Sequence, residues 1–256
     1  MDLIMLAGGE AGSRLASYSE KGLKALIRFG KEYMVNLTLE NFRKSKMIKR
    51  IYVVGNPVLK DFLKEGTFDE FVEEKGEVIE NVLKALSGPK IDRSKKVLVS
   101  ACDIPMVPPG AIDNFSGFCI NSHYEAIYPV VTKDVYDRKY PSAPRTWFYC
   151  AENTYTGGNF VAVLPEAVFR NEGIITRVYQ NRKNPLKLAA LFGMKVILKY
   201  QAGLLTKKDV EAAVTSAIRI PSFGFVSSFA ELVVDVDKPA DYSVILDCLR
   251  RLEQAL

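Results

Sequence analysis

The stretch MDLIMLAGGEAGSRL (residues 1–15) decides the fold, because an apolar run ends there in two glycines. Residues 3–6 (LIML) predict a buried strand. A Gly-Gly turn directly after such a strand lies at the carboxyl edge of the sheet, where open α/β sheets bind ligands. Glycines let backbone amides approach an anion closely, and Arg14 offers a forked cation for phosphate. The alternative is a structural turn with a solvated arginine.

The rest of the chain alternates short β-branched runs with helical patterns. Strands are predicted at 50–55, 95–101, 126–131 and 159–164, and apolar residues at helical spacing predict helices over 33–46 and 76–86. Strand–helix alternation implies a mostly parallel sheet covered by helices on both faces. The predicted fold class is therefore α/β, a three-layer α/β/α arrangement, with residues 1–256 as a single domain.

Residues 181–222 interrupt this alternation and predict a helical insertion within the domain before its last strand. The stretch PLKLAALFGMKVILKYQAGLL is apolar with interspersed lysines, and TKKDVEAAVTSAI begins with a threonine N-cap. Such a stretch favours packing on the domain or on a second subunit, as in a homodimer, over contact with a membrane. The last strand is predicted at 230–236, followed by a helix that starts near Pro239.

Composition excludes several classes of protein. The net charge of +5 is spread along the sequence without a dense basic stripe, which argues against nucleic-acid binding. No apolar run reaches about 18 residues and no signal pattern opens the chain, so a cytoplasmic protein is expected. The four cysteines share no Cys-x-x-Cys spacing and His123 is the single histidine, which disfavours zinc. Neither the dinucleotide fingerprint nor the P-loop motif is present.

Charged residues at other predicted strand ends complete a candidate site. Lys24 precedes an apolar run and can reach phosphates, Asp103 follows the strand at 95–101, and Asp235 and Asp237 close the strand at 230–236. Carboxylates from two strand ends suit Mg²⁺, which takes one or two carboxylates and fills its other positions with water and phosphate oxygens. Taken singly, Asp103 and Asp237 could instead cap a turn and the final helix.

These motifs together resemble a known family. LAGGEAGSRL, KALI, GNP, CDIP, TGGNF and VDVDKPAD occur in the order expected of nucleotidyltransferases with a GT-A-like Rossmannoid fold. The sequence is most similar to the molybdenum-cofactor guanylyltransferase-like NTP transferases, over residues 1–179 and 223–256. The resemblance implies transfer of an NMP from an NTP to a phosphorylated acceptor, with Mg²⁺ as cofactor and pyrophosphate as the leaving group.

The resemblance also implies roles for individual residues. Arg14, Lys24 and Asp103 are the implied catalytic residues, and Asp103, Asp237 and the weaker candidate Asp235 are the implied metal ligands. Leu6, Ala7, Gly8, Gly9 and Asn81 are implied to bind the nucleotide, and Thr156, Gly157, Gly158 and Asn159 to border the acceptor. The chain departs from the pattern in one place: GGEAGSR spans seven residues where relatives commonly have six, which puts Arg14 in more doubt than Lys24 or Asp103.

Two basic stretches flank TGGN, at 134–148 and 180–187. Their cations could form an acceptor-phosphate pocket or could be solvated: Lys139, Arg145, Arg182, Lys183 and Lys187. Two rival functions remain open. The DVD at 235–237 imitates the Asp-x-Asp motif of a glycosyltransferase that uses an NDP-sugar, and the extra residue in the glycine turn would fit a nucleotide-binding module without activity.

Overall fold

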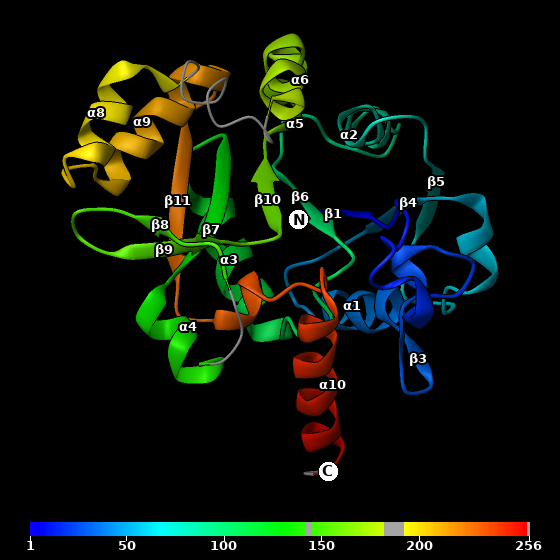
Figure 1. Cartoon of the computed structure of the whole chain (residues 1–256). Coiled ribbons are helices and arrows are strands. Elements are labelled where there is room, and N and C mark those ends of the chain that lie inside the picture. Colours follow the sequence, from blue (N-terminus) through cyan, green and yellow to red (C-terminus); the bar gives the residue numbers. More distant parts are fainter. Residues whose placement is uncertain (142–144, 182–191, 255–256) are drawn as a thin grey trace.

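The computed structural model describes residues 1–141, 145–181 and 192–254. A nine-stranded sheet has the order β5-β4-β1-β6-β10-β7-β9-β8, with β11 paired to β7 (Figure 1). Its strands are β1 (Asp2–Leu6), β4 (Ile51–Gly55), β5 (Glu70–Glu73), β6 (Val97–Ala101), β7 (Ala126–Thr132), β8 (Phe148–Tyr149), β9 (Thr154–Gly157), β10 (Phe160–Val163) and β11 (Ser222–Ser227). A separate hairpin joins β2 (Arg28–Phe29) to β3 (Glu32–Tyr33).

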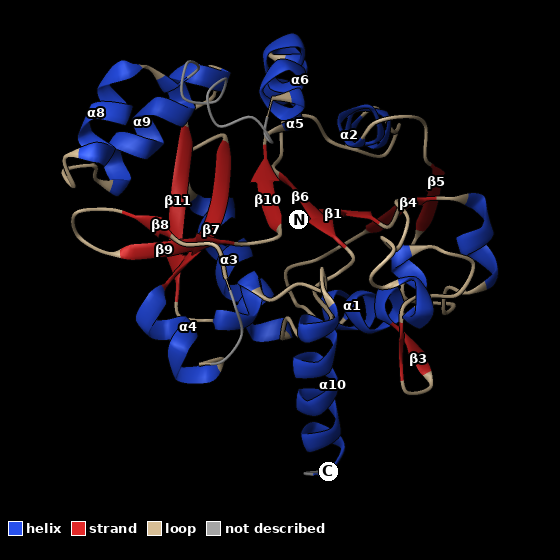
Figure 2. Cartoon of the chain, in the orientation of Figure 1, coloured by secondary structure: helices blue, strands red, loops and turns tan. Residues whose placement is uncertain are grey.

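Helices lie on both faces of the sheet (Figure 2). They are α1 (Met34–Arg43), α2 (Val78–Leu86), α3 (Pro109–Asn121), α4 (Lys133–Lys139), α5 (Pro165–Arg170), α6 (Glu172–Gln180), α8 (Met194–Gln201), α9 (Lys207–Ile218) and α10 (Pro239–Gln254). Short 3₁₀ turns are η1 (Ala16–Tyr18), η2 (Lys24–Leu26), η3 (Pro57–Asp61) and η4 (Ala230–Val233). None of the described helices is both long and apolar enough to cross a bilayer.

Strand β1 shows why the sheet needs two layers of helices. Leu3 and Met5 point into the larger core, which includes residues of α1 and α3, whereas Ile4 points into a second core with residues of α2 and α5. All three side chains are fully buried. A strand that is buried on both faces requires a continuous apolar run, which is what residues 3–6 provide. The predicted three-layer α/β/α fold is confirmed.

The sheet is mixed, although most strands run in one direction. β1, β4, β5 and β6 are parallel to one another, and β11 is parallel to β7. β10 is antiparallel to both of its neighbours, and β9 is antiparallel to β7 and β8. The reversal of β10 places the loop that enters this strand at the same edge as the ends of β1 and β6.

The predicted strand at 230–236 is wrong. Residues 230–233 form the 3₁₀ turn η4, and the place beside β7 is taken by β11, in register from Ser222 opposite Ala126 to Ser227 opposite Val131. Leu232 and Val236 are fully buried in the larger core without joining the sheet. A short apolar run signals burial and does not by itself distinguish a strand from a buried turn.

The other predicted elements are found close to their expected positions. The helix predicted at 33–46 is α1, that at 76–86 is α2, and the final helix begins at Pro239. Between 192 and 218 the chain is mainly helical, in α8 and α9, and α9 packs against β11. Thr206 caps α9 in a reciprocal capping box with Asp209.

Candidate active site

The glycine turn and Asp103 lie at one edge of the sheet because β1 and β6 are adjacent parallel strands. Leu6 pairs with Ala101, and the Cys102 amide donates to the Leu6 carbonyl at 3.1 Å. Beyond the turn, the Lys24 amide donates to the Gly9 carbonyl at 3.1 Å. This bond holds the start of η2 beside the glycine turn, so that Lys24 and Asp103 reach the same point from opposite sides.

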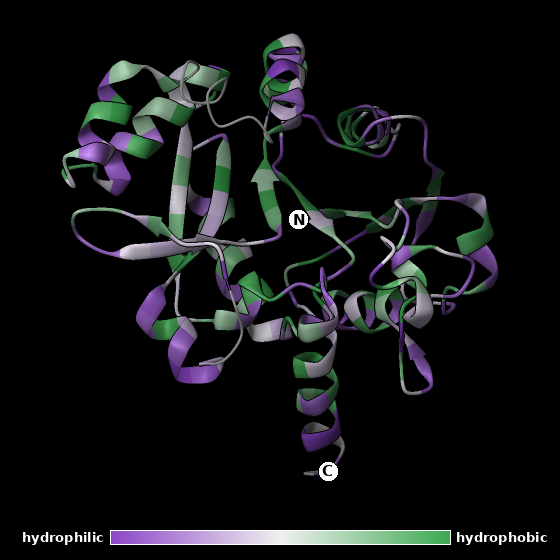
Figure 3. Ribbon diagram, in the orientation of Figure 1, coloured by the Kyte–Doolittle hydropathy of each residue, from purple (hydrophilic) through white to green (hydrophobic). Residues whose placement is uncertain are grey.

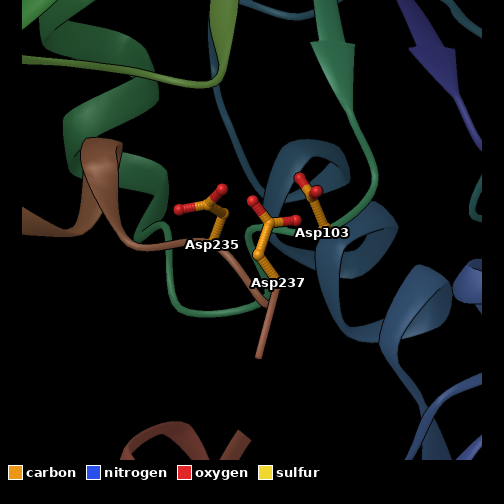
Figure 4. A group of neighbouring side chains, drawn as sticks. All are labelled: Asp103, Asp235 and Asp237. Carbon is orange, nitrogen blue, oxygen red and sulfur yellow. The ribbon is translucent and has the colours of Figure 1, made fainter. Parts of the chain in front are cut away.

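Three carboxylates converge at this edge (Figure 4). Asp103, Asp235 and Asp237 each offer an oxygen that lies within 4.8 Å of the other two. The Val236 amide donates to the Asp103 carbonyl at 3.0 Å, which fixes the segment after η4 against the end of β6. Asp235 and Asp237 flank Val236, and both carboxylates lie beside Asp103. The site therefore forms without the strand that the sequence predicted there.

Lys24 bridges two of these carboxylates. Its Nζ lies 2.5 Å from Asp103 Oδ2 and 2.6 Å from Asp237 Oδ1. Burial by itself would lower the pKa of Lys24, but the two carboxylates outweigh that effect and raise it above the ordinary value. Burial likewise works to raise the pKa of Asp237, and the hydrogen bond from Lys24 more than offsets this, so the pKa of Asp237 is lowered.

Asp235 is held by a different cation, Arg145. The Arg145 guanidinium pairs with Asp235 through Nη1, and its Nε donates to Thr156 Oγ1 at 3.2 Å. Nη2 of Arg145 also donates to the Gly157 carbonyl at 3.2 Å. Burial raises the pKa of Asp235 to about 6, even though Arg145 acts in the opposite direction. Arg145 thus ties the TGGN segment to the carboxylate cluster.

The hydrogen bonds of Asp103 and Asp237 differ from those of residues that only cap a turn or a helix. Asp103 Oδ2 bonds to Lys24, and Asp103 Oδ1 is buried without a hydrogen-bond partner among the described residues. Asp241, in the first turn of α10, accepts the amides of Asp237 and Lys238 at 3.0 and 2.8 Å. The capping role that Asp237 could have played is therefore filled by Asp241, and the Asp237 carboxylate faces Lys24.

The predicted acceptor residues line a cavity of about 570 Å³ next to the carboxylates. Its lining includes Arg145, Thr156, Gly157, Gly158, Asn159, Asp235 and Asp237. Gly158 has no room for a side chain, because a Cβ would lie 2.8 Å from Pro129 Cγ and 3.0 Å from the Leu232 carbonyl oxygen. Glycine is thus required where the TGGN segment passes between β7 and η4. Trp147 also lines this cavity and stacks edge-on against Tyr136.

A smaller cavity of about 200 Å³ lies over the glycine turn. Its lining includes Leu6, Gly8, Gly9 and Asn81, as expected of a nucleotide pocket, and also Glu74. Asn81 accepts the Lys75 amide at 2.5 Å and donates to the Gly76 carbonyl at 3.4 Å. Its amide therefore holds the loop before α2 and shapes this pocket.

The structure adds Glu74 to the lining of this pocket and does not place Ala7 on it. Glu74 was missed, since nothing in its local pattern sets it apart from other loop carboxylates. A Cβ on Gly8 would lie 2.0 Å from Glu74 Oε2, so a side chain at this position would require the Glu74 carboxylate to move. Ala7 is fully buried, does not line the small cavity, and donates its amide to the Val54 carbonyl at 2.7 Å.

The remaining predicted cations lie outside this arrangement. Arg14 is exposed in a turn closed by the bond from the Leu15 amide to the Gly12 carbonyl, at 2.8 Å, and no ion pair joins it to another described residue. Lys139 pairs with Glu231 and does not line the acceptor cavity. Arg182, Lys183 and Lys187 lie outside the described residues.

Comparison with solved structures shows several proteins of the same fold. A hypothetical transferase from Thermus thermophilus is 28% identical, with a TM-score of 0.83, and the match covers 94% of this chain and 98% of the other. A nucleotidyl transferase from Methanothermobacter is 15% identical with a TM-score of 0.55, covering 98% of each chain. A CMP:2-keto-3-deoxy-manno-octonic acid synthetase complexed with CTP is 13% identical with a TM-score of 0.57, again covering 98% of each chain.

The family assignment comes from the sequence match. A search of curated proteins found no match. Comparison with protein families matched the one described as the MobA-like NTP transferase domain over residues 3–203, which is well over half of the chain. This range includes the glycine turn, Lys24, Asp103 and the TGGN segment. The chain belongs to the MobA-like NTP transferase family and is a nucleotidyltransferase.

Proposed function

We propose that this enzyme transfers an NMP from an NTP to a phosphorylated small-molecule acceptor, with release of pyrophosphate and dependence on Mg²⁺. One observation carries the proposal: three carboxylates and Lys24 meet at the sheet edge that carries the glycine turn, and two of the carboxylates line the cavity at the TGGN segment. A charged centre at an edge with a cavity at each of these segments suits a reaction that joins two bound substrates.

The charge of the cluster supports a divalent cation. With Asp103, Asp235 and Asp237 ionised, the three negative charges exceed the two positive charges of Lys24 and Arg145 by one. The buried Oδ1 of Asp103 has no partner among the described residues, and a buried carboxylate oxygen needs one. Asp103 and Asp237 are the proposed ligands, with Asp235 beside them, and bound Mg²⁺ would supply Lewis-acid stabilisation of the phosphate oxygens.

Positioning and charge stabilisation account for the rest of the chemistry. An acceptor phosphate is already ionised near neutral pH, so its oxygen can attack the α-phosphorus of the NTP without a strong general base. In the proposed arrangement Gly8 and Gly9 present backbone amides to the triphosphate. Lys24 neutralises charge as the pyrophosphate leaves, and Arg14 would do so only if its exposed turn moved toward the triphosphate. Arg145 would orient the acceptor phosphate from the TGGN side.

The first test is thermal stability with each of the four NTPs, with and without Mg²⁺, followed by a pyrophosphate-release screen with the NTP that binds. A ligand that binds the folded state raises the melting temperature by mass action. We expect one NTP to give a Mg²⁺-dependent shift. Turnover of an NDP-sugar with release of NDP, and no shift with any NTP, would instead establish a glycosyltransferase.

Asp103→Asn tests the metal assignment. The substitution keeps the size of the side chain and removes one negative charge, so we expect Mg²⁺-dependent pyrophosphate release to fall by at least about 100-fold while the protein stays folded. Asp113→Asn is a matched control, because Asp113 lies in α3 and bonds to Ser45 and the Met47 amide. Near wild-type turnover in Asp103→Asn would refute the assignment.

We also propose that residues 1–256 act as one domain, with 181–222 as an insertion through which two copies associate. Exposed apolar side chains on and after α8 support this proposal: Met194 is 69% exposed, Leu198 59% and Leu204 64%. Sedimentation of the wild type should give a dimer, and Leu198→Glu should shift it toward the monomer. A monomer at all concentrations would exclude the contact.

A further inference from the structure

A second, apolar groove adjoins the acceptor cavity. It has a volume of about 500 Å³ and runs along the sheet between α2 and α6. Val82 of α2, Val161 of β10 and Val178 of α6 are among its lining residues, and no charged side chain of the described residues joins them. Figure 3 shows α2 and β10 as largely hydrophobic. An apolar groove of this size next to a polar site is typical of a ligand pocket.

The groove and the acceptor cavity meet at two residues. Asn159 and Tyr128 line both of them. The Tyr128 hydroxyl donates to the Gly158 carbonyl, and Asn159 accepts the Ala101 amide through its own carbonyl at 3.1 Å. The Asn159 Nδ2 is buried without a hydrogen-bond partner among the described residues. A buried amide without a partner costs stability, so an oxygen of a ligand that accepted a hydrogen bond from it at the junction would be favoured.

We propose that the acceptor is amphipathic: a monophosphate whose apolar chain lies in this groove while its phosphate lies beside Arg145. The inference rests on the proposed function in one respect: the word "acceptor" assumes nucleotidyl transfer. Binding of the amphipathic phosphate itself requires only the two cavities. The polar end carries Arg145 and the TGGN segment, and the apolar end carries aliphatic side chains from α2, β10 and α6. A molecule that spans the junction must therefore have a charged head and an apolar tail.

The test is calorimetric titration of the whole protein with n-butyl, n-hexyl and n-octyl phosphate, below their micellar concentrations and without nucleotide. Burial of each methylene group in an apolar site strengthens binding by roughly fourfold. We expect affinity to rise with chain length until the groove is filled. Equal affinity for the three phosphates, or no binding by any of them, would overturn the inference.

A groove-filling variant localises the effect. Val161→Phe enlarges a half-buried side chain on the lining of the groove and should abolish the dependence on chain length, while butyl phosphate binds as before. Ile120→Phe is the matched control, because Ile120 is 49% exposed on α3, away from the groove. The melting transition shows whether Val161→Phe folds. If it does not, Val178→Asp replaces it, because Val178 lies on the rim of the groove formed by α6. Unchanged chain-length dependence in the folded variant would overturn the inference.

The outcome is separable from that of the proposed function. Chain-length-dependent binding without pyrophosphate release from any NTP would support the groove and refute the transferase proposal. Pyrophosphate release with short, polar phosphates and no gain from a longer chain would support the transferase and refute the amphipathic acceptor.

Discussion

Replacing Lys24 with methionine tests how much the ion pairs of Lys24 stabilise the fold. The substitution keeps most of the aliphatic stem but removes the ammonium that bonds to Asp103 and Asp237 at 2.5 and 2.6 Å. Asp103 then remains in a site where its side chain is only 12% exposed, whereas Asp237, at 59%, can be hydrated. The loss of folding stability in Lys24→Met therefore arises mainly from the unpaired Asp103 carboxylate.

The magnitude follows from that difference in exposure. Removing one partner of a buried ion pair costs about 3–5 kcal/mol, and an exposed pair contributes about 0–1 kcal/mol. Lys24 and Asp103 are buried but still touch solvent, so we expect Lys24→Met to lower the free energy of unfolding by about 2–4 kcal/mol at pH 8.

The assay is urea denaturation at pH 8, with Lys31→Met as control. Lys31 is exposed, so its loss changes the net charge equally without breaking a buried pair. Added Mg²⁺ should restore more stability to Lys24→Met than to the wild type, since a bound cation replaces the missing charge. A loss below about 0.5 kcal/mol at pH 8 would refute the reasoning.

Three further predictions concern the TGGN side of the site. Because the pKa of Asp235 is raised to about 6 in the folded state, ionisation of this carboxyl destabilises the fold. Asp235→Asn should therefore gain stability relative to the wild type as pH rises from 4 to 7, by at most about 3 kcal/mol. Denaturation of both proteins at each pH measures this difference. Gly158→Ala should cost about 1–3 kcal/mol by crowding the Leu232 carbonyl, while Gly12→Ala, which has nothing within 4 Å, should melt near the wild type. Arg145→Lys loses the guanidinium fork, and we expect the KM for the acceptor to rise about tenfold with a smaller change in kcat; an unchanged KM would remove Arg145 from the acceptor pocket.

The sequence predicted the strands of the sheet more reliably than their directions. Continuous apolar runs such as residues 3–6 identified β1, β4, β6, β7 and β10, because strands buried on both faces need such runs. Nothing in the run at 159–164 indicates that β10 is antiparallel to its neighbours, since direction depends on pairing with distant strands. β11 was missed because Ser222 and Gly224 weaken its strand pattern.

The structure brings several predicted site residues together, although one element that carries them differs from the prediction. Asp103 and Lys24 meet in the structure because each follows or precedes a buried run at the carboxyl edge. Asp235 lies beside Asp103, although the strand expected before it is a 3₁₀ turn. The roles of these residues stay predictions. The two-cation arrangement could not be predicted, because the pairing of Lys24 with Asp237 and of Arg145 with Asp235 joins residues that are far apart along the chain.

The order of the site residues along the chain has a consequence for synthesis on the ribosome. The glycine turn and Asn81 are made early, and Asp103 soon after, whereas Asp235 and Asp237 come more than 130 residues later than Asp103. Domains fold as the chain emerges, from the N-terminal side first. A nascent chain can thus form the glycine turn long before Asp235 and Asp237 complete the carboxylate cluster. We therefore expect that a nascent chain cannot carry out the proposed transfer until residues 235–237 have emerged.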